Sequence, residues 1–367
     1  MPAMLNSSEQ SMSRPALQLS AITLSELQAL IKGLGEPAYR AKQVIEWRNK
    51  GVLAVDEMKN IPATLRLKLT ESLIFQPLEL VQRQCSQDGT RKYLFRITSG
   101  RTAGKMVETV FIPDEKRGTV CVSSQVGCVL DCPFCYTGTQ GFDGNLTAGE
   151  IVGQVLAVKH DLLTDPVSEE LHAMVTHFVY MGMGEPMANE DGVHESLKIL
   201  MAEDGLKLSQ RRITVSTSGL VPQINRLGET YPVNLAISLH AASDEQRDIL
   251  VPINRKYPLK ALRECLDDYP LAAQRHITLE YVMLKGVNDQ PEDIEALARF
   301  VNRQRERVNL ISFNAYPGNP YDGSSKNHMN EFAKKLISKG VRATVRRSRG
   351  QDIMAACGQL KAEGIST

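Results

Sequence analysis

The sequence predicts an α/β protein, in which a partial (β/α)6-type barrel follows a small helical domain and a β-hairpin extension. Three observations support this fold class. From Gly118 onward, apolar segments of strand length alternate with amphipathic segments of helix length, which is typical of a parallel sheet. Residues 23–73 carry helical periodicity. Between these parts, Asp88-Gly89 separates strand-like segments and indicates a hairpin turn.

These patterns divide the chain of 367 residues into successive parts. The first residues are polar and rich in serine, which is typical of a disordered tail. The parts are a disordered tail (1–20), a helical domain (21–76), a β-hairpin extension (77–115), the barrel (116–350) and a C-terminal segment (351–367).

The helical domain begins with a capping box, Thr23-x-x-Glu26, followed by an apolar stripe that ends near Gly33. Lysines and arginines are scattered over all three of its expected helices. Such charges fit either a solvated helix surface or a surface that docks nucleic acid, and the sequence favours neither.

The hairpin extension contains a lone carboxylate, Glu108, in an otherwise apolar strand that is expected to end at Pro113. Because strands alternate faces, Glu108 either points to solvent or serves as a general acid or base. The strands expected here are Leu78–Cys85, Tyr93–Thr98 and Met106–Ile112.

In the barrel, a second capping box, Thr147-x-x-Glu150, starts the first helix. A site is expected where the carboxyl ends of the parallel strands meet. The strands expected are Thr119–Ser123, His177–Met181, Arg212–Thr217, Asn234–Leu239, Thr278–Leu284, Val308–Phe313 and Val341–Arg346. Further helices are expected at Gly192–Met201, Val221–Leu227, Leu259–Asp268, Pro291–Val301 and Glu331–Lys339.

The first barrel strand leads into a C-x3-C-x2-C run formed by Cys128, Cys132 and Cys135. Three thiolates on one tight loop suit three irons of a [4Fe–4S] cluster and leave the fourth iron open to a ligand. The alternative is structural zinc, which prefers four ligands; the run has no second C-x2-C pair to complete such a site. Cys121 lies too far upstream to share the loop.

Polar or small residues end the successive barrel strands. The Gly184-Glu185 pair allows close backbone approach and offers a carboxylate to the ammonium of a bound amino acid. His240 is expected to be a hydrogen-bonding residue of this rim rather than a base or metal ligand. The candidates at the strand ends are Gly184, Glu185, Ser216, Ser238, Leu239, His240 and Asn314.

Residues 332–351 carry lysines and arginines and no acidic residue, which fits either phosphate contacts or a solvated basic face. Cys357 follows in a loop of small residues. Cationic neighbours would make this thiol nucleophilic, whereas a buried, inert cysteine is the ordinary alternative.

Composition and charge are those of an ordinary globular protein, with a net charge of +1 and seven cysteines. The first fifteen residues lack the apolar segment of a secretory signal, and no apolar run approaches membrane-spanning length. We therefore expect a cytoplasmic protein with reduced thiols and no membrane association.

The motifs MVETVFIP, GMGEP, RRITVSTSG, AISLHA, LVPINRKYP, YVMLKGVND and AACGQL, together with the cysteine run, resemble one family. This is the RlmN family of radical S-adenosylmethionine (SAM) methyltransferases, which act on adenosine C2 in 23S rRNA and tRNA. The resemblance covers nearly the whole chain. It implies a radical-SAM barrel, one [4Fe–4S] cluster per chain, two SAM molecules consumed per turnover and an RNA-contacting N-terminal domain.

The resemblance also assigns roles to residues. Cys128, Cys132 and Cys135 match the cluster ligands, and the strand-end candidates match the SAM-contacting positions. Cys357 matches the cysteine that becomes S-methylated, Cys121 its resolving partner in a transient disulfide, and Glu108 the proton acceptor. The implied reaction passes through a protein–RNA crosslink.

The resemblance implies 23S rRNA and tRNA as partners and a low-potential electron donor such as flavodoxin; we expect a monomer. A related alternative is a Cfr-type methyltransferase that modifies adenine C8 with the same cysteine pair. From other classes, the alternatives are an RNA-binding protein with a structural metal and a radical-SAM enzyme that activates a protein. The latter would have no use for the Cys121 and Cys357 pair.

Overall fold

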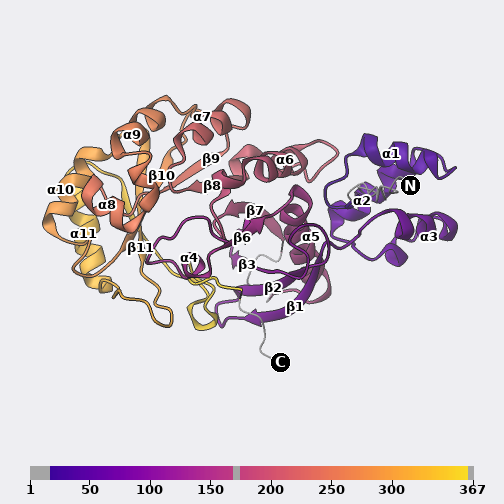
Figure 1. The fold of residues 1–367 in the computed structure, drawn as a ribbon, viewed down its shortest axis with the longest axis horizontal. Coiled ribbons are helices and arrows are strands. Elements are labelled where there is room, and N and C mark those ends of the chain that lie inside the picture. Colours follow the sequence, from indigo (N-terminus) through magenta and orange to yellow (C-terminus); the bar gives the residue numbers. More distant parts are fainter. Residues whose placement is uncertain (1–16, 168–173, 363–367) are drawn as a thin grey trace, which may run out of the picture.

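The computed structural model describes residues 17–167 and 174–362, and its described residues form two lobes side by side (Figure 1). The smaller lobe holds the N-terminal helices. The larger lobe is built on a ten-stranded sheet with the order β1-β2-β3-β4-β7-β8-β9-β10-β11-β12. Strands β1 to β4 pair antiparallel, and every later pair in the sheet, from β4–β7 onward, is parallel.

The strands closely follow the expected segments. They are β1 (Leu78–Cys85), β2 (Arg91–Ile97), β3 (Met106–Asp114), β4 (Arg117–Cys121), β7 (Val175–Tyr180), β8 (Ile213–Thr217), β9 (Asn234–Ser238), β10 (Ile277–Met283), β11 (Glu306–Ser312) and β12 (Ala343–Arg346). A separate two-stranded sheet joins β5 (Gln125–Gly127) to β6 (Phe142–Asn145) and frames the cysteine run.

Helices cover the parallel strands on the outside and leave the carboxyl ends of the strands open (Figure 1). Within the described residues they are α1 (Leu24–Gly33), α2 (Arg40–Lys50), α3 (Ala63–Ser72), α4 (Tyr136–Gln140), α5 (Ala148–Thr164), α6 (Glu190–Met201), α7 (Val221–Thr230), α8 (Asp244–Leu250), α9 (Leu259–Asp268), α10 (Pro291–Phe300) and α11 (Lys326–Ser338). None of the described helices has the length and apolar character needed to cross a bilayer.

Both expected capping boxes are present. The Thr23 hydroxyl accepts from the Glu26 amide and the Glu26 carboxylate accepts from the Thr23 amide. Thr147 and Glu150 make the same reciprocal pair at the start of α5. Each box satisfies amides that the first helical turn leaves unpaired, which explains why these helices begin where they do.

The register across the sheet sets the chemistry of its inner face. Lys92 on β2 lies opposite Val110 on β3, and Val110 lies opposite Cys121 on β4. Cys121 in turn lies opposite Val179 on β7. Residues that face each other across a ladder share one face of the sheet. A lysine and a cysteine are thus brought to the same face from different strands.

The smaller lobe is attached through buried polar contacts. Arg48 on α2 is 2% exposed, and its guanidinium donates to the carbonyls of Ile22 (2.9 Å) and Asp204 (3.2 Å). Asn49 Nδ2 also donates to the Gly205 carbonyl (2.6 Å). The loop after α6 therefore anchors the helical lobe to the barrel.

Several boundaries differ from the expectation. The tail was placed at 1–20; residues 1–16 lie outside the described ranges, but Leu19 is fully buried in the small lobe, and its amide donates to the Ile74 carbonyl (2.8 Å). The boundary at residue 20 is therefore too late, because an apolar side chain there completes the helical core. Pro113 lies inside β3 and does not end it.

The hairpin extension is part of the main sheet, because β3 pairs with β4, the first barrel strand. The last helix begins at Lys326 rather than at Glu331, because the Ser325 hydroxyl caps it by accepting from the His328 amide.

Candidate active site

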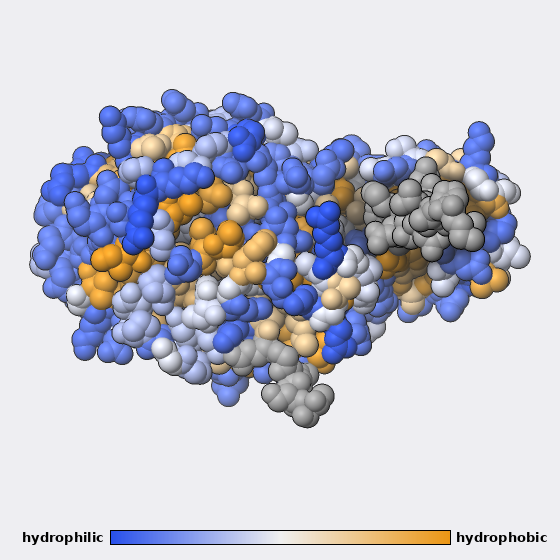
Figure 2. All heavy atoms as spheres, in the orientation of Figure 1, coloured by the Kyte–Doolittle hydropathy of each residue, from blue (hydrophilic) through white to orange (hydrophobic). Residues whose placement is uncertain are grey.

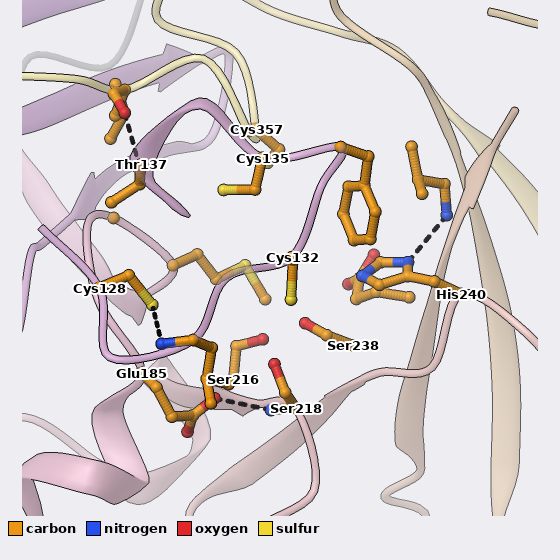
Figure 3. Close-up of a pocket in the computed structure, with 18 of the residues that line it drawn as sticks. Cys128, Cys132, Cys135, Thr137, Glu185, Ser216, Ser218, Ser238, His240 and Cys357 are labelled. Carbon is orange, nitrogen blue, oxygen red and sulfur yellow. Dashed lines mark hydrogen bonds between the residues drawn. The ribbon is translucent and has the colours of Figure 1, made fainter. Parts of the chain in front are cut away.

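A cavity of about 160 Å³ lies at the carboxyl ends of β7, β8, β9 and β10, beside the cysteine loop (Figure 3). Apolar side chains gather in the hollow of the larger lobe (Figure 2). The polar and sulfur-bearing residues that line the cavity of about 160 Å³ include Cys128, Cys132, Cys135, Glu185, Ser216, Ser218, Ser238, His240 and Cys357.

The cysteine loop is closed by backbone hydrogen bonds. The Cys128 amide donates to the Gly141 carbonyl (3.0 Å), and the Cys135 amide donates to the Cys132 carbonyl (3.0 Å). Gly127 starts the loop with a φ of +69°, and a Cβ at this position would lie 1.7 Å from the Gly141 carbonyl oxygen. Only glycine fits so close an approach, and the loop is thereby drawn into a tight ring.

The three thiols suit a multi-iron cluster. Cys128, Cys132 and Cys135 are free thiols on one loop and line one cavity (Figure 3). Burial raises the pKa of each, that of Cys128 to about 12, so a bound cation is needed to stabilise the thiolates. Within the described ranges, no three His, Cys, Asp or Glu side chains converge as ligands of one metal ion. The C-x3-C-x2-C spacing of these residues suits three corners of a cluster better than the two C-x2-C pairs usual for structural zinc.

Glu185 is a buried carboxylate held by backbone amides. Its oxygens accept from the Ser218 amide (2.8 Å) and the Met187 amide (2.9 Å). Burial raises the pKa of Glu185 above its usual value, and these donors offset only part of that rise. Gly184 has a φ of +98° and packs against Gln125, so a side chain there would be strained and crowded. The arrangement fixes a carboxylate at the cavity wall, where it suits an ammonium group.

His240 already has a hydrogen-bond partner. Its Nδ1 accepts from the Val282 amide (3.0 Å), and its ring contacts the edge of Phe134 at 4.8 Å between centroids (Figure 3). Burial, with a contribution from Arg247, lowers the pKa of His240 to about 3. The imidazole is therefore neutral at physiological pH and belongs to the hydrogen-bonded rim.

Two of the strand-end candidates do not line this cavity. Leu239 is fully buried among the core residues behind it. Asn314 lines an adjoining cavity, where its Nδ2 donates to the Cys357 carbonyl (3.1 Å). The structure therefore brings Asn314 to the segment that carries Cys357 rather than to the cysteine loop formed by residues 128–135.

The adjoining cavity, of about 320 Å³, brings two further free cysteines, Cys121 and Cys357, together. Cys121 at the end of β4 and Cys357 both line it, and Cys357 also lines the first cavity. Both are free thiols. Burial, followed by the neighbouring Cys357, raises the pKa of Cys121 to about 12.

The segment 357–361 is tied to distant parts of the chain. The Thr137 hydroxyl donates to the Leu360 carbonyl (2.6 Å), and Asn314 holds the Cys357 carbonyl. In Figure 1 the yellow C-terminal segment passes beside α4, and the Tyr136 amide donates to the Gly358 carbonyl (2.8 Å). Cys357 is thus fixed between the cluster loop and the main sheet.

Arg346 on β12 lines the site, whereas the sequence left open whether its basic run contacts phosphates or forms a solvated face. It lines both cavities, with Cys357 as a shared neighbour. The Cys357 thiol and Glu280 raise the pKa of Arg346 well above its usual value against the effect of burial. Its position at the carboxyl end of an expected strand was the available signal, since Ile311, its partner on β11, also lines both cavities.

Other members of the basic run are paired with acids. Lys334 contacts Glu331 (2.7 Å), and Lys339 contacts Glu295 (2.6 Å). This part of the run therefore forms a helix surface with salt bridges. The sequence does not show the partner of Lys339, because Glu295 lies on another helix.

Glu108 is buried rather than solvent-facing. One oxygen lies 3.0 Å from Lys92 Nζ, and the other accepts from the Lys361 amide (2.9 Å). Glu108 shares its strand face with Val110 and Ile112, which line the cavity of Cys121 and Cys357. Glu108 is therefore a carboxylate held in place beside a cavity that two thiols line.

Comparisons with known proteins agree with this arrangement. Residues 122–301 match the radical SAM superfamily, and residues 17–74 match the family described as the ribosomal RNA large subunit methyltransferase N-terminal domain. A solved structure of a radical SAM methyltransferase from Sphaerobacter thermophilus aligns with a TM-score of 0.87 and 42% identity, over 95% of this chain and 100% of that one.

Curated relatives are similar along their length. A dual-specificity RNA methyltransferase RlmN from Anaeromyxobacter sp. (strain Fw109-5) is 46% identical over 351 residues, covering 95% of this chain and 92% of the relative. Another protein of this description, from Rhodopseudomonas palustris (strain BisB5), is 48% identical over 331 residues, with coverage of 88% and 83%.

Proposed function

The chain belongs to the RlmN family of radical SAM methyltransferases, and we propose that it methylates C2 of a specific adenosine in 23S rRNA and in tRNA. It is a SAM-dependent RNA methyltransferase with a [4Fe–4S] cluster. The finer assignments below concern its residues, its stoichiometry and its partners.

Cys128, Cys132 and Cys135 would hold one cluster per chain, and Gly184, Glu185, Ser216, Ser238 and His240 would contact SAM, with Leu239 and Asn314 as supporting positions. When bound, the reduced cluster supplies the electron for reductive cleavage of SAM. Glu185 offers its carboxylate to the amino group of SAM, and the buried rim excludes water from the reacting atoms. Two SAM molecules are consumed per turnover, because the methyl group and the radical come from different molecules.

Cys357 carries the methyl group. C2 of adenine is too electron-poor to attack the SAM methyl directly, so the Cys357 thiolate takes it by displacement. The 5′-deoxyadenosyl radical from the second SAM takes a hydrogen atom from the methyl group on Cys357, and the resulting carbon radical adds to C2, which leaves protein and RNA covalently linked. The adduct radical gives up one electron to the oxidised cluster as C2 loses its proton. Cys121 then attacks the Cys357 sulfur, the bond from that sulfur to the carbon breaks, and the carbon takes up a proton to become the methyl group of the released RNA. The disulfide that remains is later reopened by a reductant. Glu108 accepts the proton that C2 loses.

One observation carries this proposal: Cys121 and Cys357, far apart in sequence, line the same cavity next to the cysteine loop. A structural metal protein would have no use for two further free thiols converging there.

The test is to isolate the Cys121→Ala variant from cells and look for RNA bound through Cys357. We expect a stalled adduct that survives denaturation, whereas Cys357→Ala yields none, and Cys265→Ala, on α9, behaves as wild type. Sequencing the trapped RNA identifies the substrates. Mass spectrometry of wild-type product places the methyl on C2; a methyl on C8 would instead indicate the Cfr-type reaction. Product formation by Cys357→Ala would contradict the proposal.

The partners follow from this chemistry. The helical domain (21–76) would contact RNA, and the C-terminal segment (351–367) would present the methyl-carrying cysteine to the barrel (116–350) and the hairpin extension (77–115). The target adenine must be unstacked to reach Cys357, which is easiest in a loop. A low-potential donor such as flavodoxin would reduce the cluster, and the enzyme would work as a cytoplasmic monomer away from membranes.

A further inference from the structure

The Glu108 carboxylate has a cationic neighbour on an adjacent strand. Lys92 Nζ, on β2, lies 3.0 Å from Glu108 Oε1, and both side chains are largely buried, 12% and 6% exposed. A buried carboxylate is strongly destabilised unless it is paired or hydrogen-bonded. Burying a lysine carries a similar cost in free energy. This pair is therefore not an ordinary surface salt bridge, and a role in the site would account for its cost.

The sheet register explains how the pair reaches the reactive thiols. Lys92 lies opposite Val110, and Val110 lies opposite Cys121. Glu108 is the diagonal neighbour of Lys92 on the same face, because Leu94 is its direct partner. The pair therefore flanks the wall of the cavity that holds Cys121 and Cys357.

The pair also contacts the chain on both sides of Cys357. The second Glu108 oxygen accepts from the Lys361 amide (2.9 Å). Lys92 Nζ lies 3.5 Å from the Met354 carbonyl, a longer and weaker contact. The ammonium thus fixes the carboxylate and the carboxylate fixes the segment that carries Cys357.

We propose that Lys92 is a positioning residue for proton removal: it holds the Glu108 carboxylate in register with the Cys357 segment. This inference rests on the proposed function, in which Glu108 takes the C2 proton. In that step the C2–H bond of the radical adduct breaks: its proton passes to a Glu108 oxygen, the bonding electron pair stays in the purine ring, and the unpaired electron leaves the adduct for the oxidised cluster. Without Lys92, the Glu108 carboxylate would be more mobile and would point toward the C2 proton for a smaller fraction of the time. Only the proton-removal step would therefore become slower.

The test separates steps of the reaction in the full-length holoenzyme. Lys92→Met and Lys92→Gln remove the ammonium, and Lys92→Arg keeps a cation of similar reach. The matched control is Arg96→Met, which removes a half-exposed cation of the same strand that pairs with Glu79. Three quantities are measured: S-methylation of Cys357 by peptide mass spectrometry, the fraction of protein covalently bound to RNA, and the decay rate of that adduct with protium or deuterium at adenine C2.

For Lys92→Met and Lys92→Gln we expect wild-type S-methylation, but adduct decay slowed by about tenfold, a rise in barrier of about 1.4 kcal/mol. Decay should also acquire a deuterium isotope effect, because breaking the C2–H bond becomes rate-limiting. Lys92→Arg should restore most of the rate, and Arg96→Met should match wild type.

The outcomes are distinguishable. Wild-type decay in both Lys92→Met and Lys92→Gln overturns the inference. So does slow decay without an isotope effect, or loss of S-methylation together with adduct formation, which would indicate a merely structural residue. Cys121→Ala is run in parallel: if it forms no adduct, the proposed function itself fails, whereas an adduct there with normal Lys92 variants removes only the role of Lys92.

Discussion

At the scale of single residues, burial holds some of the groups that line the cavity in their neutral form. His240 is the clearest case, since desolvation and the nearby Arg247 lower its pKa to about 3. Its Nδ1 is occupied by the Val282 amide, so protonation would also break a buried hydrogen bond.

This predicts a pH dependence of stability. Between pH 6.5 and about 3 the unfolded chain binds a proton at residue 240 that the folded chain does not. The contribution is therefore fully present above pH 6.5 and is lost as the pH falls, by up to about 1.4 kcal/mol per pH unit. Urea unfolding of cluster-free wild type and His240→Gln at pH 7, 6 and 5 should give a steeper decline for wild type. Parallel declines would contradict the assignment.

Residues whose roles depend on local spacing could be predicted from sequence, and residues whose roles depend on pairing could not. Cys128, Cys132 and Cys135 lie on one loop, so their common cavity follows from their spacing alone. Arg346 was one cation in a basic run, and only the pairing of β12 with β11 turns it toward Cys357. The Lys92 pairing likewise depends on strand register.

At the scale of elements, α5 supports the cysteine segment from behind. Gln154 on α5 accepts from the Ser123 amide (2.8 Å) and donates to the Ser123 carbonyl (2.9 Å). The Thr147–Glu150 capping box fixes the first turn of this helix. The cap thus contributes to the position of the strand end from which the cysteine loop departs.

Replacing the cap should destabilise the fold modestly. Thr147→Ala removes the acceptor of the Glu150 amide, at a cost of about 1 kcal/mol. Thr164→Ala, at the exposed end of α5, is the control and should stay within about 0.5 kcal/mol of wild type. Urea denaturation of the three proteins measures both values; equal midpoints for Thr147→Ala and wild type would show that water replaces the cap.

Long, periodic elements such as α9 and β10 were predicted closely, because a core face repeats along them. The short α4 and the β5–β6 pair were not predicted. Their stability comes from tertiary contacts, such as the Tyr136 amide donating to the Gly358 carbonyl (2.8 Å). Because these elements are short, the sequence shows no hydrophobic periodicity that would predict them.

At the scale of the whole molecule, Arg48 connects the helical lobe to the barrel. Its pKa falls to about 10 because of burial, and the chain keeps it there by satisfying its donors with carbonyls of both lobes. The sequence indicated the helical lobe, but not this attachment, because the Asp204 carbonyl carries no sequence signal.

Arg48→Met should loosen the lobe without unfolding the barrel. Unpaired buried carbonyls cost about 1–3 kcal/mol each. We expect faster amide hydrogen exchange in residues 17–74, unchanged exchange in the inner strands and weaker RNA binding. Lys42→Met, exposed on α2, serves as the stability control. Uniform protection in the Arg48→Met variant would show that apolar packing alone holds the lobe.

The hydrogen bond from the Thr137 hydroxyl to the Leu360 carbonyl joins positions separated by 223 residues. Ribosomes add about 5–20 residues per second, so the cysteine loop leaves the ribosome on the order of ten seconds or more before the segment that closes over it. Throughout that interval Cys128, Cys132 and Cys135 lack the segment that packs beside their loop, and Cys357 has not yet been added to the chain. The cavity that Cys357 completes is therefore among the last features to form during biosynthesis.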